Sequence, residues 1–371
     1  MMDEMLAAKQ RPRLRSYSPL ILGYAAQGKA TQAFAAYDRM LLSADAAGTA
    51  AIEPTEAELA ALLRVAGRAR DEGMFLRALR DTQEVVLEPT AETWEAVAAW
   101  YEQTARVTRP ARIGPDGVCG ACGGKLLSVD LPPEGAEALL GMVEEIVLQN
   151  AERRGDWEKF KAWLGEAVAR DAFDVVVDGA NVGYFQMNYA GAPPHVNYDQ
   201  VAWVVDHLRR QGRRPLLVLH ARHVQDKKVP PAYLGLVRAW RESGVLYTVP
   251  YRSNDDWFWL CATVKRGGRT LVVTNDQMRD HHFQMLSRRT FLRWRERHQA
   301  LFSFGGALRD GTRAVKVEEP PVFSRCIQGP VTLGAEDEAA TRRGRSRWHL
   351  PLAESQDWLC VVEEDRQSEK A

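Results

Sequence analysis

The stretch Phe-Asp-Val-Val-Val-Asp at residues 173–178 is a short β-branched run that ends on an acid. Three further apolar runs follow it, ending at His220, just before Pro250, and at Asn275-Asp276. Stretches with apolar residues at helical spacing separate the runs, at residues 199–211, 232–243, 255–265 and 278–287. Strands and helices that alternate in this way predict a parallel α/β sheet.

Acidic side chains stand where these predicted strands end. They are Asp178 after the first strand, Asp255 and Asp256 at the start of the helix after the third, Asp276 after the fourth, and Asp280 one helical turn further on. Because the carboxyl ends of parallel strands share one edge of a sheet, we expect these carboxylates to converge on one rim. For any single acid, capping the next helix is the alternative interpretation. Ser253 and Asn254 already offer caps before the adjacent pair, so capping does not account for two consecutive acids.

Carboxylates gathered at one rim repel one another and raise each other's pKa, and divalent cations remove that conflict. All the candidate ligands are oxygen donors, which suits Mg²⁺, or Mn²⁺ as the alternative, better than Zn²⁺. Two such ions about 4 Å apart can activate a water and stabilise the leaving oxygen of a phosphodiester. The rim therefore predicts hydrolysis by a metal-dependent nuclease, with the aspartates as ligands and no protein nucleophile.

Residues from about 16 to 106 are rich in Ala and Leu, with apolar positions at helical spacing. Glu53-Pro54-Thr55 recurs 35 residues later as Glu88-Pro89-Thr90, and each copy suits the first turn of a helix. The stretch from Ser16 to Met40 has the same plan of helix, Gly-containing turn and helix. This spacing predicts a short array of helix pairs, which resembles a pentatricopeptide-repeat array that binds RNA. A generic α-hairpin array that binds protein is the alternative.

The chain contains a CxxC pair, Cys119 and Cys122, in a Gly-rich turn. Such a turn can place two thiolates on one tetrahedral ion. The residues after it, 125–130, are predicted to form a short strand, which favours metal binding over the redox role of a CxxC at a helix N-terminus. His349 and Cys360, each beside a Trp, would complete a Cys₃His zinc set. From spacing alone, a buried Cys360 and a surface His349 explain these two residues as well.

The 371 residues carry 49 Lys+Arg and 49 Asp+Glu, so any binding to a polyanion must come from clustered cations. Five cysteines in this length do not form a disulfide scaffold, and no apolar run is long enough to span a membrane. Candidate RNA contacts lie beside the acidic rim: His220, Arg222, Lys227, Arg279 and His281. A solvated surface is the alternative for such a run of charge. The aromatic set at residues 257–259 is predicted to be core, with base stacking as the alternative.

Five motifs together resemble one known family, protein-only ribonuclease P. They are Asp178–Gly183, Ser253–Leu260, Thr274–His281, Trp348–Pro351 and Trp358–Cys360, in the order in which that family carries them. The family joins pentatricopeptide repeats, a split zinc-binding domain and a metallonuclease domain of the NYN type within the PIN-like group. The resemblance extends over nearly the whole chain.

The resemblance implies a magnesium-dependent endonuclease that removes the 5′ leader of precursor tRNA and leaves a 5′-phosphate. It implies that Asp178, Asp255, Asp256 and Asp276 are catalytic metal ligands at a site with two Mg²⁺ ions, with Asp280 in support. It implies one structural Zn²⁺ on the ligand set Cys119, Cys122, His349 and Cys360. It also implies a monomer that needs no RNA subunit and no membrane. A less selective RNA endonuclease, and an RNA-binding module with an inactive nuclease fold, are the alternatives.

The expected fold is thus a helical repeat array and an α/β parallel-sheet nuclease domain, joined by a small zinc-binding domain with short strands. We expect the repeats at residues 1–107, the split zinc-binding domain at 108–131 and 331–371, and the nuclease domain at 132–330. The family acts in the nucleus, mitochondrion or plastid. The start of the chain lacks the composition of a transit peptide, which favours the nucleus.

Overall fold

The structure of the chain is a computed structural model that describes residues 12–43, 52–104, 106–279, 288–308, 311–329 and 348–363. It divides into two compact units. The repeat unit comprises Met1–Val129 and Val322–Ala371, and the sheet unit comprises Asp130–Pro321. Each unit has its own hydrophobic core. None of the described helices is both long and apolar enough to cross a membrane.

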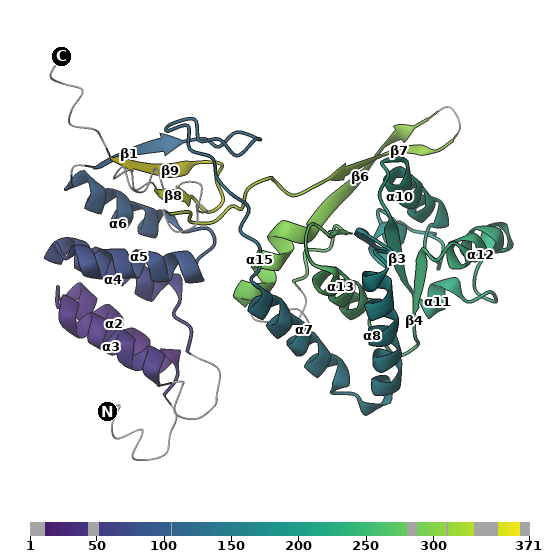
Figure 1. The fold of residues 1–371 in the computed structure, drawn as a ribbon, viewed down its shortest axis with the longest axis horizontal. Helices are drawn as coiled ribbons and strands as arrows, with labels where there is room; N and C mark the ends of the chain where they lie inside the picture. The colour runs from purple at the N-terminus through teal and green to yellow at the C-terminus, as the bar shows by residue number, and fades with distance from the viewer. Residues whose placement is uncertain are drawn as a thin grey trace. The chain divides into compact units, whose positions relative to one another are not determined.

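The repeat unit begins with helices that pack pairwise (Figure 1). They are α2 (Leu14–Ala26), α3 (Ala30–Leu42), α4 (Glu56–Ala69), α5 (Glu72–Val85) and α6 (Ala91–Glu102). Thr55 caps α4 through a capping box with Glu58, and Thr90 is the N-cap residue of α6. The N-termini of α4 and α6 are also linked, because the Thr90 backbone N–H donates to Glu56 Oε1 over 2.6 Å. The predicted helix pairs and their 35-residue period are confirmed.

A three-stranded antiparallel sheet completes the repeat unit. Its strands are β1 (Arg106–Ala111), β9 (Trp358–Glu363) and β8 (Trp348–Pro351), in that order. Helix α6 supports this sheet, since Trp94 Nε1 donates to the Leu350 carbonyl over 3.2 Å. The sheet therefore pairs a strand from residues before the sheet unit with two strands from residues after it.

The strand predicted at residues 125–130 is wrong. Lys125 forms an isolated bridge with Val118, and the following residues are irregular. Side chains take the place of a partner strand: the Gln328 amide both donates to and accepts from the Leu127 backbone at 2.9 Å, and Ser324 Oγ accepts from Val129 N at 2.8 Å. Because these side chains satisfy the hydrogen-bonding groups of the backbone, the segment does not need to pair with a strand.

The sheet unit is built on a six-stranded sheet of order β4-β3-β2-β5-β6-β7. Its strands are β2 (Val175–Asp178), β3 (Pro215–His220), β4 (Leu246–Val249), β5 (Leu271–Val273), β6 (Gln299–Ala307) and β7 (Arg313–Glu318). All neighbouring pairs from β4 to β6 are parallel, and only β7 runs antiparallel to its neighbour. The predicted parallel sheet is confirmed.

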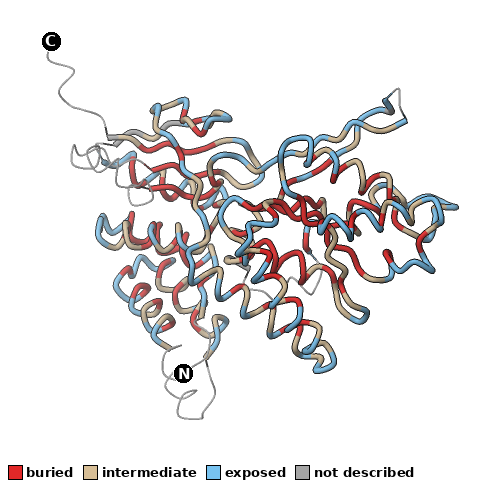
Figure 2. The backbone as a smooth tube through the Cα atoms, turned by 45° about the vertical axis from the view of Figure 1, so that its right-hand side comes forward, coloured by how far each residue is buried: buried red, intermediate tan, exposed pale blue. Residues whose placement is uncertain are grey.

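Helices cover both faces of this sheet (Figure 1). One face carries α7 (Pro133–Leu148), α8 (Arg154–Ala169), α13 (Asp255–Arg266) and α15 (Arg288–His298), and the other α9 (Gly179–Tyr184), α10 (Tyr198–Arg210), α11 (Ala221–Val224) and α12 (Leu234–Glu242). Strand β2 alternates between the two layers, with Val176 in one core and Val175 and Val177 in the other. Figure 2 shows buried residues, in red, gathered in the interior of the sheet unit.

The structure tests three of the helical segments predicted in the sheet unit. The aromatic set Trp257, Phe258 and Trp259 on α13 is buried, so its prediction as core is confirmed. The segment 232–243 opens with a 3₁₀ turn at Pro231–Tyr233 before α12 begins. The helix predicted from Met278 does not begin there, because Met278 has φ +52° and Asp276 Oδ1 accepts from its N–H over 2.8 Å. The rest of that segment, 280–287, lies outside the described residues.

Candidate active site and metal cluster

Asp178 stands at the carboxyl end of the central strand β2 and is 4% exposed. Its Oδ1 accepts from Asn181 N at 3.0 Å, and its Oδ2 accepts from Thr274 Oγ1 at 2.9 Å. The next residue must be small, because a Cβ on Gly179 would lie 2.5 Å from Leu219 Cγ. The carboxylate is therefore held at the start of α9 by a tight strand-to-helix turn.

Asp276 is tied to Asp178 through Thr274, whose Oγ1 accepts from the Asp276 backbone N–H over 3.1 Å. The loop that carries it is fixed to β6. Asn275 Nδ2 donates to the Phe302 carbonyl over 2.8 Å, and Phe302 N donates to Asn275 Oδ1 over 3.0 Å. Gln299 Nε2 donates to the Asp276 carbonyl over 2.8 Å. These bonds give Asp276 a defined backbone position beyond the end of β5.

Asp255 and Asp256 open helix α13, and Asn254 is its N-cap, with Oδ1 accepting from Asp256 N over 3.1 Å. The prediction that Asn254 supplies the cap is thus confirmed, and the two acids are left for another role. Asp256 Oδ1 accepts from Trp259 Nε1 over 3.3 Å. Asp255 is 8% exposed, and its buried Oδ2 has no hydrogen-bond partner among the described residues.

The four acids act on one another electrostatically. Burial, and then the charge of Asp256, raises the pKa of Asp178 well above its ordinary value. Burial, followed by the charge of Asp255, raises the pKa of Asp256 to about 7, and Asp276 adds to this shift. In the described part of the chain none of the four acids is paired with Lys or Arg, and no three of them are close enough as they stand to form a ready metal-binding group. The site is therefore an uncompensated group of carboxylates, held near one another without close packing.

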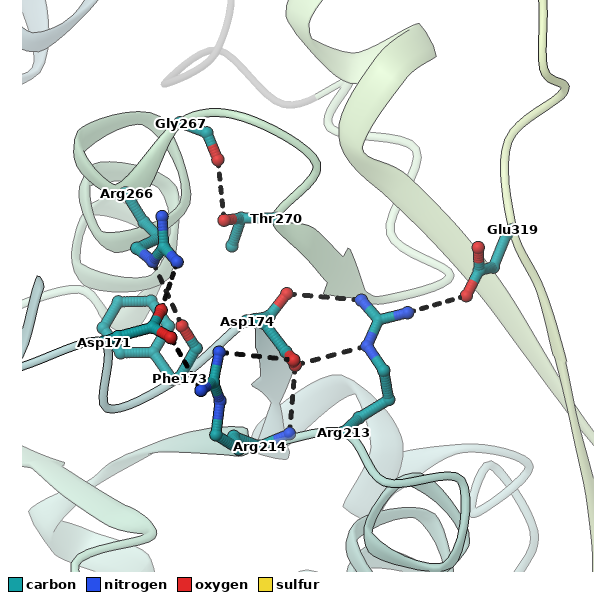
Figure 3. Close-up of polar contacts among 9 residues, drawn as sticks. All are labelled: Asp171, Phe173, Asp174, Arg213, Arg214, Arg266, Gly267, Thr270 and Glu319. Atoms are coloured by element: carbon teal, nitrogen blue, oxygen red, sulfur yellow. Dashed lines mark hydrogen bonds and ion pairs between the residues drawn. The ribbon is translucent and has the colours of Figure 1, made fainter.

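The opposite end of the same strand shows how this chain neutralises an acid that has a structural role (Figure 3). Asp174, just before β2, accepts from Arg213 Nε at 3.2 Å and from Arg214 N at 3.0 Å, and Arg214 also pairs with Asp171 at 2.7 Å. Arg266 donates to the Phe173 carbonyl at 3.2 Å. Asp171 and Asp174 at the amino end of the sheet thus have arginine partners, whereas the four candidate acids at the carboxyl end have none among the described residues.

The candidate RNA contacts after β3 divide into buried and exposed residues. His220 is buried, and Arg222 and Lys227 are exposed. Burial, and then the positive charge of Arg222, lowers the pKa of His220, while Asp255 acts in the opposite direction. His223 beside it is also buried, and burial with the Arg222 charge lowers its pKa to about 4. Both imidazoles are therefore neutral at pH 7.

The remaining charged candidates follow β5. Arg279 is exposed and donates to Gln277, while Asp280 and His281 lie outside the described residues. Of the arginines on α15, Arg297 is largely buried and pairs with Asp130 over 2.8 Å. That ion pair is within the sheet unit and gives Arg297 a structural partner.

The four Cys and His residues singled out by the sequence lie together in the repeat unit. Their Sγ and imidazole nitrogen atoms are all within 4.8 Å of one another. Cys122 Sγ is 3.3 Å from His349 Nε2, and Cys360 Sγ is 3.6 Å from the same atom. His349 and Cys360 are directly opposite each other on β8 and β9, which places their side chains on one face. Cys119 and Cys122 reach them from the Gly-rich turn after β1.

The protonation of this cluster depends on its members' mutual contacts. Hydrogen bonds from the thiols of Cys122 and Cys360 lower the pKa of Cys119, whereas contacts with Cys119 and Cys122 raise the pKa of Cys360. Burial alone would lower the pKa of His349, but hydrogen bonds with Cys119 and Cys122 raise it to about 9. The pKa of Cys122 is lowered as well, so ionisation is favoured at Cys119 and Cys122 and opposed at Cys360. A cation is therefore needed before all three thiols can act as thiolate ligands. The cluster can hold a metal ion.

Several residues that shape the acidic site were not predicted from the sequence. Thr274 and Asn181 hold the Asp178 carboxylate, while Asn275 and Gln299 fix the loop of Asp276. Thr274, Asn275 and Asn181 stand within quoted motifs, next to the acids, and that adjacency was the available signal. Gln299 begins a strand at some distance in sequence, and its role follows from the pairing of β5 with β6.

The fold and the site define a class: a helical-repeat protein with a parallel α/β nuclease domain whose carboxylates gather at the strand ends. A family model described as Protein-only RNase P matches residues 113–367. A second, described as the pentacotripeptide-repeat region of the same family, matches residues 1–107. The chain belongs to the protein-only RNase P family, and the resemblance read from the motifs is confirmed.

Individual relatives agree with this assignment. Proteinaceous RNase P 1, chloroplastic/mitochondrial, of Arabidopsis thaliana is 27% identical over 411 residues, which cover 97% of this chain and 64% of that protein. Proteinaceous RNase P 3 of the same plant is 30% identical over 404 residues, with coverages of 95% and 64%. The chain thus spans 64% of the length of these two relatives.

A solved structure shares the architecture. The crystal structure of nuclear proteinaceous RNase P 2 from A. thaliana superposes with a TM-score of 0.74 at 26% identity, covering 98% of this chain and 78% of that chain. The first of these relatives is named as a chloroplastic/mitochondrial form and the protein of the solved structure as a nuclear form.

Proposed function

We propose that this chain is an endoribonuclease that removes the 5′ leader of precursor tRNA by hydrolysis and leaves a 5′-phosphate on the mature tRNA. The observation that carries the proposal is the group of uncompensated carboxylates at the carboxyl ends of β2 and β5 and at the start of α13. Family membership and the names of the relatives supply the substrate. We propose that the chain acts as a monomer and without an RNA subunit.

The carboxylates Asp178, Asp255, Asp256 and Asp276 would hold Mg²⁺, with Mn²⁺ as a substitute, and Asp280 would support them. The fit rests on the donor set: oxygen ligands, a raised pKa at Asp178 and Asp256, and the unpartnered buried Oδ2 of Asp255. When bound, a pair of Mg²⁺ ions supplies Lewis-acid activation of water and of the scissile phosphodiester. Thr274 and Asn181 orient Asp178, and Asn275 holds the loop of Asp276.

The set Cys119, Cys122, His349 and Cys360 would hold one structural Zn²⁺. Three thiols and one imidazole with donor atoms within 4.8 Å of one another fit the ligand preference of zinc. With all four positions taken by protein there is no open position for water, so the role is structural. We assign substrate contacts to His220, Arg222, Lys227, Arg279 and His281 on the sheet unit, and RNA recognition to the helical repeats.

The test is cleavage of one precursor tRNA in Mg²⁺, with both new ends mapped. The parent chain should cut once, at the mature 5′ end, while Asp255→Ala and Asp256→Ala should lose cleavage and keep RNA affinity within a few-fold. Glu158→Gln, which removes an exposed acid of α8, is the matched control and should cut normally. Many cuts would favour the less selective endonuclease. Binding without any cut would favour the inactive RNA-binding module.

A further inference from the structure

A row of aromatic side chains runs along the carboxyl ends of β2, β3 and β4, beside the acidic site. We call Tyr184, His223, His220 and Tyr251 the aromatic row. Neighbouring rings have centroids 5.5, 6.5 and 5.6 Å apart in that order, and each pair meets at 74° or more. The row thus connects the helix that follows Asp178 with the turn that follows β4.

The row has a rigid base and an exposed top. His220 and His223 are 8% and 5% exposed, whereas Tyr184 and Tyr251 are 40% and 45% exposed. Arg222 Nε donates to His223 Nε2 over 2.9 Å, and the Tyr198 hydroxyl donates to the His223 carbonyl over 2.6 Å. The two tyrosines are therefore held by buried histidines and keep much of their ring surface in solvent.

Cations accompany the exposed rings. Lys228 Nζ lies 5.6 Å from the centroid of the Tyr251 ring, and the Tyr251 hydroxyl donates to Gln225 Oε1 over 2.7 Å. Arg222, next in the chain to His223, is exposed. The acid of this loop, Asp226, is paired with Arg241 over 2.9 Å and so does not neutralise Lys228. Exposed rings interleaved with cations form the surface that single-stranded nucleic acid binds by stacking and phosphate contact.

We propose that Tyr184 and Tyr251 stack unpaired nucleotides of the 5′ leader next to the scissile phosphate, with Lys228 contacting the leader backbone. This rests on the proposed function. The leader side is favoured because stacking platforms accept bases that are free of pairing, whereas the first nucleotide of mature tRNA is paired in the acceptor stem. The row supplies affinity and register at the cut, and takes no part in bond breaking.

The position of the row relative to the acids supports this assignment. Tyr184 ends the short helix that Asp178 begins, and the charge of Asp255 acts on His220. Because the strands are parallel, the row and the acids share one edge of the sheet. A strand of RNA that places a phosphate at the acids can therefore continue over the row.

The experiment compares two precursor tRNAs under single-turnover conditions, one with an intact leader and one whose two leader nucleotides next to the cut are abasic. Tyr184→Leu and Tyr251→Leu should each weaken binding of the intact leader by about 5- to 100-fold, the range expected for loss of one stacked base. Tyr184→Phe and Tyr251→Phe keep an aromatic ring and should bind the intact leader as tightly as the parent. Tyr189→Leu removes a 58% exposed tyrosine of the same unit and should bind normally.

On the abasic leader, the parent and both leucine variants should bind equally, because both stacked bases are gone; each variant should therefore lose only the one stack that it still makes on the intact leader. The proposal would be overturned if the leucine substitutions lowered the affinity equally for both substrates, or lowered it for neither. If the parent does not cut precursor tRNA, the proposed function fails separately. The row is then tested by quenching of 2-aminopurine in a single-stranded RNA: quenching lost in Tyr251→Leu supports stacking, and quenching retained in both leucine variants overturns it.

Discussion

Replacing Asp256 with asparagine should stabilise the metal-free protein at pH 8. The pKa of Asp256 is raised from 3.8 to about 7, chiefly by burial and then by the charge of Asp255. Its contribution to stability is therefore full below the unfolded value of 3.8 and is lost as the pH rises through about 7. Asparagine is neutral throughout and can still accept from Trp259 Nε1, so it avoids that loss.

The size of the effect follows from the shift. A displacement from 3.8 to about 7 is about three pKa units, which corresponds to a ceiling of about 4 kcal/mol in the free energy of unfolding. Two effects reduce it. Water that reaches the partly exposed carboxylate weakens the burial penalty, and an acid in the first turn of α13 is favoured by about 0.3–1 kcal/mol. We expect Asp256→Asn to gain about 1–3 kcal/mol at pH 8.

The assay is urea unfolding at pH 4.5, 6 and 8, followed by tryptophan fluorescence. Buffers passed over a chelating resin remove free divalent ions without a soluble chelator that would strip the Cys/His cluster. Because parent and variant are compared at each pH, the contributions to the free energy of unfolding from groups that titrate alike in both proteins cancel. Added Mg²⁺ should reverse the order, because a ligand at 100 times its Kd stabilises the parent by about 2.7 kcal/mol and the variant by less.

The matched control is Glu158→Gln, whose difference from the parent should be within about 0.5 kcal/mol and independent of pH. The reasoning is refuted if Asp256→Asn is less stable than the parent at pH 8 without Mg²⁺. It is also refuted if the difference between the two proteins is the same at pH 4.5 and pH 8, since the cost would then not come from an ionised carboxylate.

Three further variants test other parts of the structure. Cys122→Ser should lower the bound zinc measured by mass spectrometry and the unfolding temperature, whereas Cys261→Ala, in the other unit, should leave zinc unchanged; equal zinc in both would contradict the assigned ligands. Asp174→Ala should cost about 1–3 kcal/mol by removing one partner each of Arg213 and Arg214, which keep Glu319 and Asp171, with cleavage per folded molecule retained. Asn275→Ala removes two hydrogen bonds to Phe302 and should lower the cleavage rate at subsaturating Mg²⁺ by about tenfold. An unchanged rate would show that the loop of Asp276 keeps its position without these hydrogen bonds.

The candidate acids were predictable because their positions depend on local order in the chain. An acid directly after a buried strand lies at the carboxyl edge of a parallel sheet whatever the details of packing, which applies to Asp178 and Asp276. The cap at Asn254 follows from sequence adjacency in the same way. The Cys/His cluster was predictable as a ligand set by family resemblance, whereas spacing alone left His349 and Cys360 undecided.

Other features depend on contacts between distant residues and could not be predicted from a local pattern. The segment after Cys122 has strand-like composition, yet side chains of Ser324 and Gln328 satisfy its backbone. Met278 is helix-forming by type, but the carboxylate of Asp276 holds its backbone in a turn with positive φ. The aromatic residues at 257–259 were predicted as core and are buried, whereas the exposed Tyr184 and Tyr251, at the end of α9 and in the turn after β4, had no signal in the local pattern.

The antiparallel pairing of His349 with Cys360 has a consequence for protein synthesis. A ribosome that stops anywhere between residues 280 and 348 releases a chain that already contains Asp178, Asp255, Asp256 and Asp276. That chain lacks two of the four side chains of the Cys/His cluster and two of the three strands beside α6. Final assembly of the repeat unit therefore requires β8 and β9, and a chain interrupted before them keeps only Cys119 and Cys122 of the cluster.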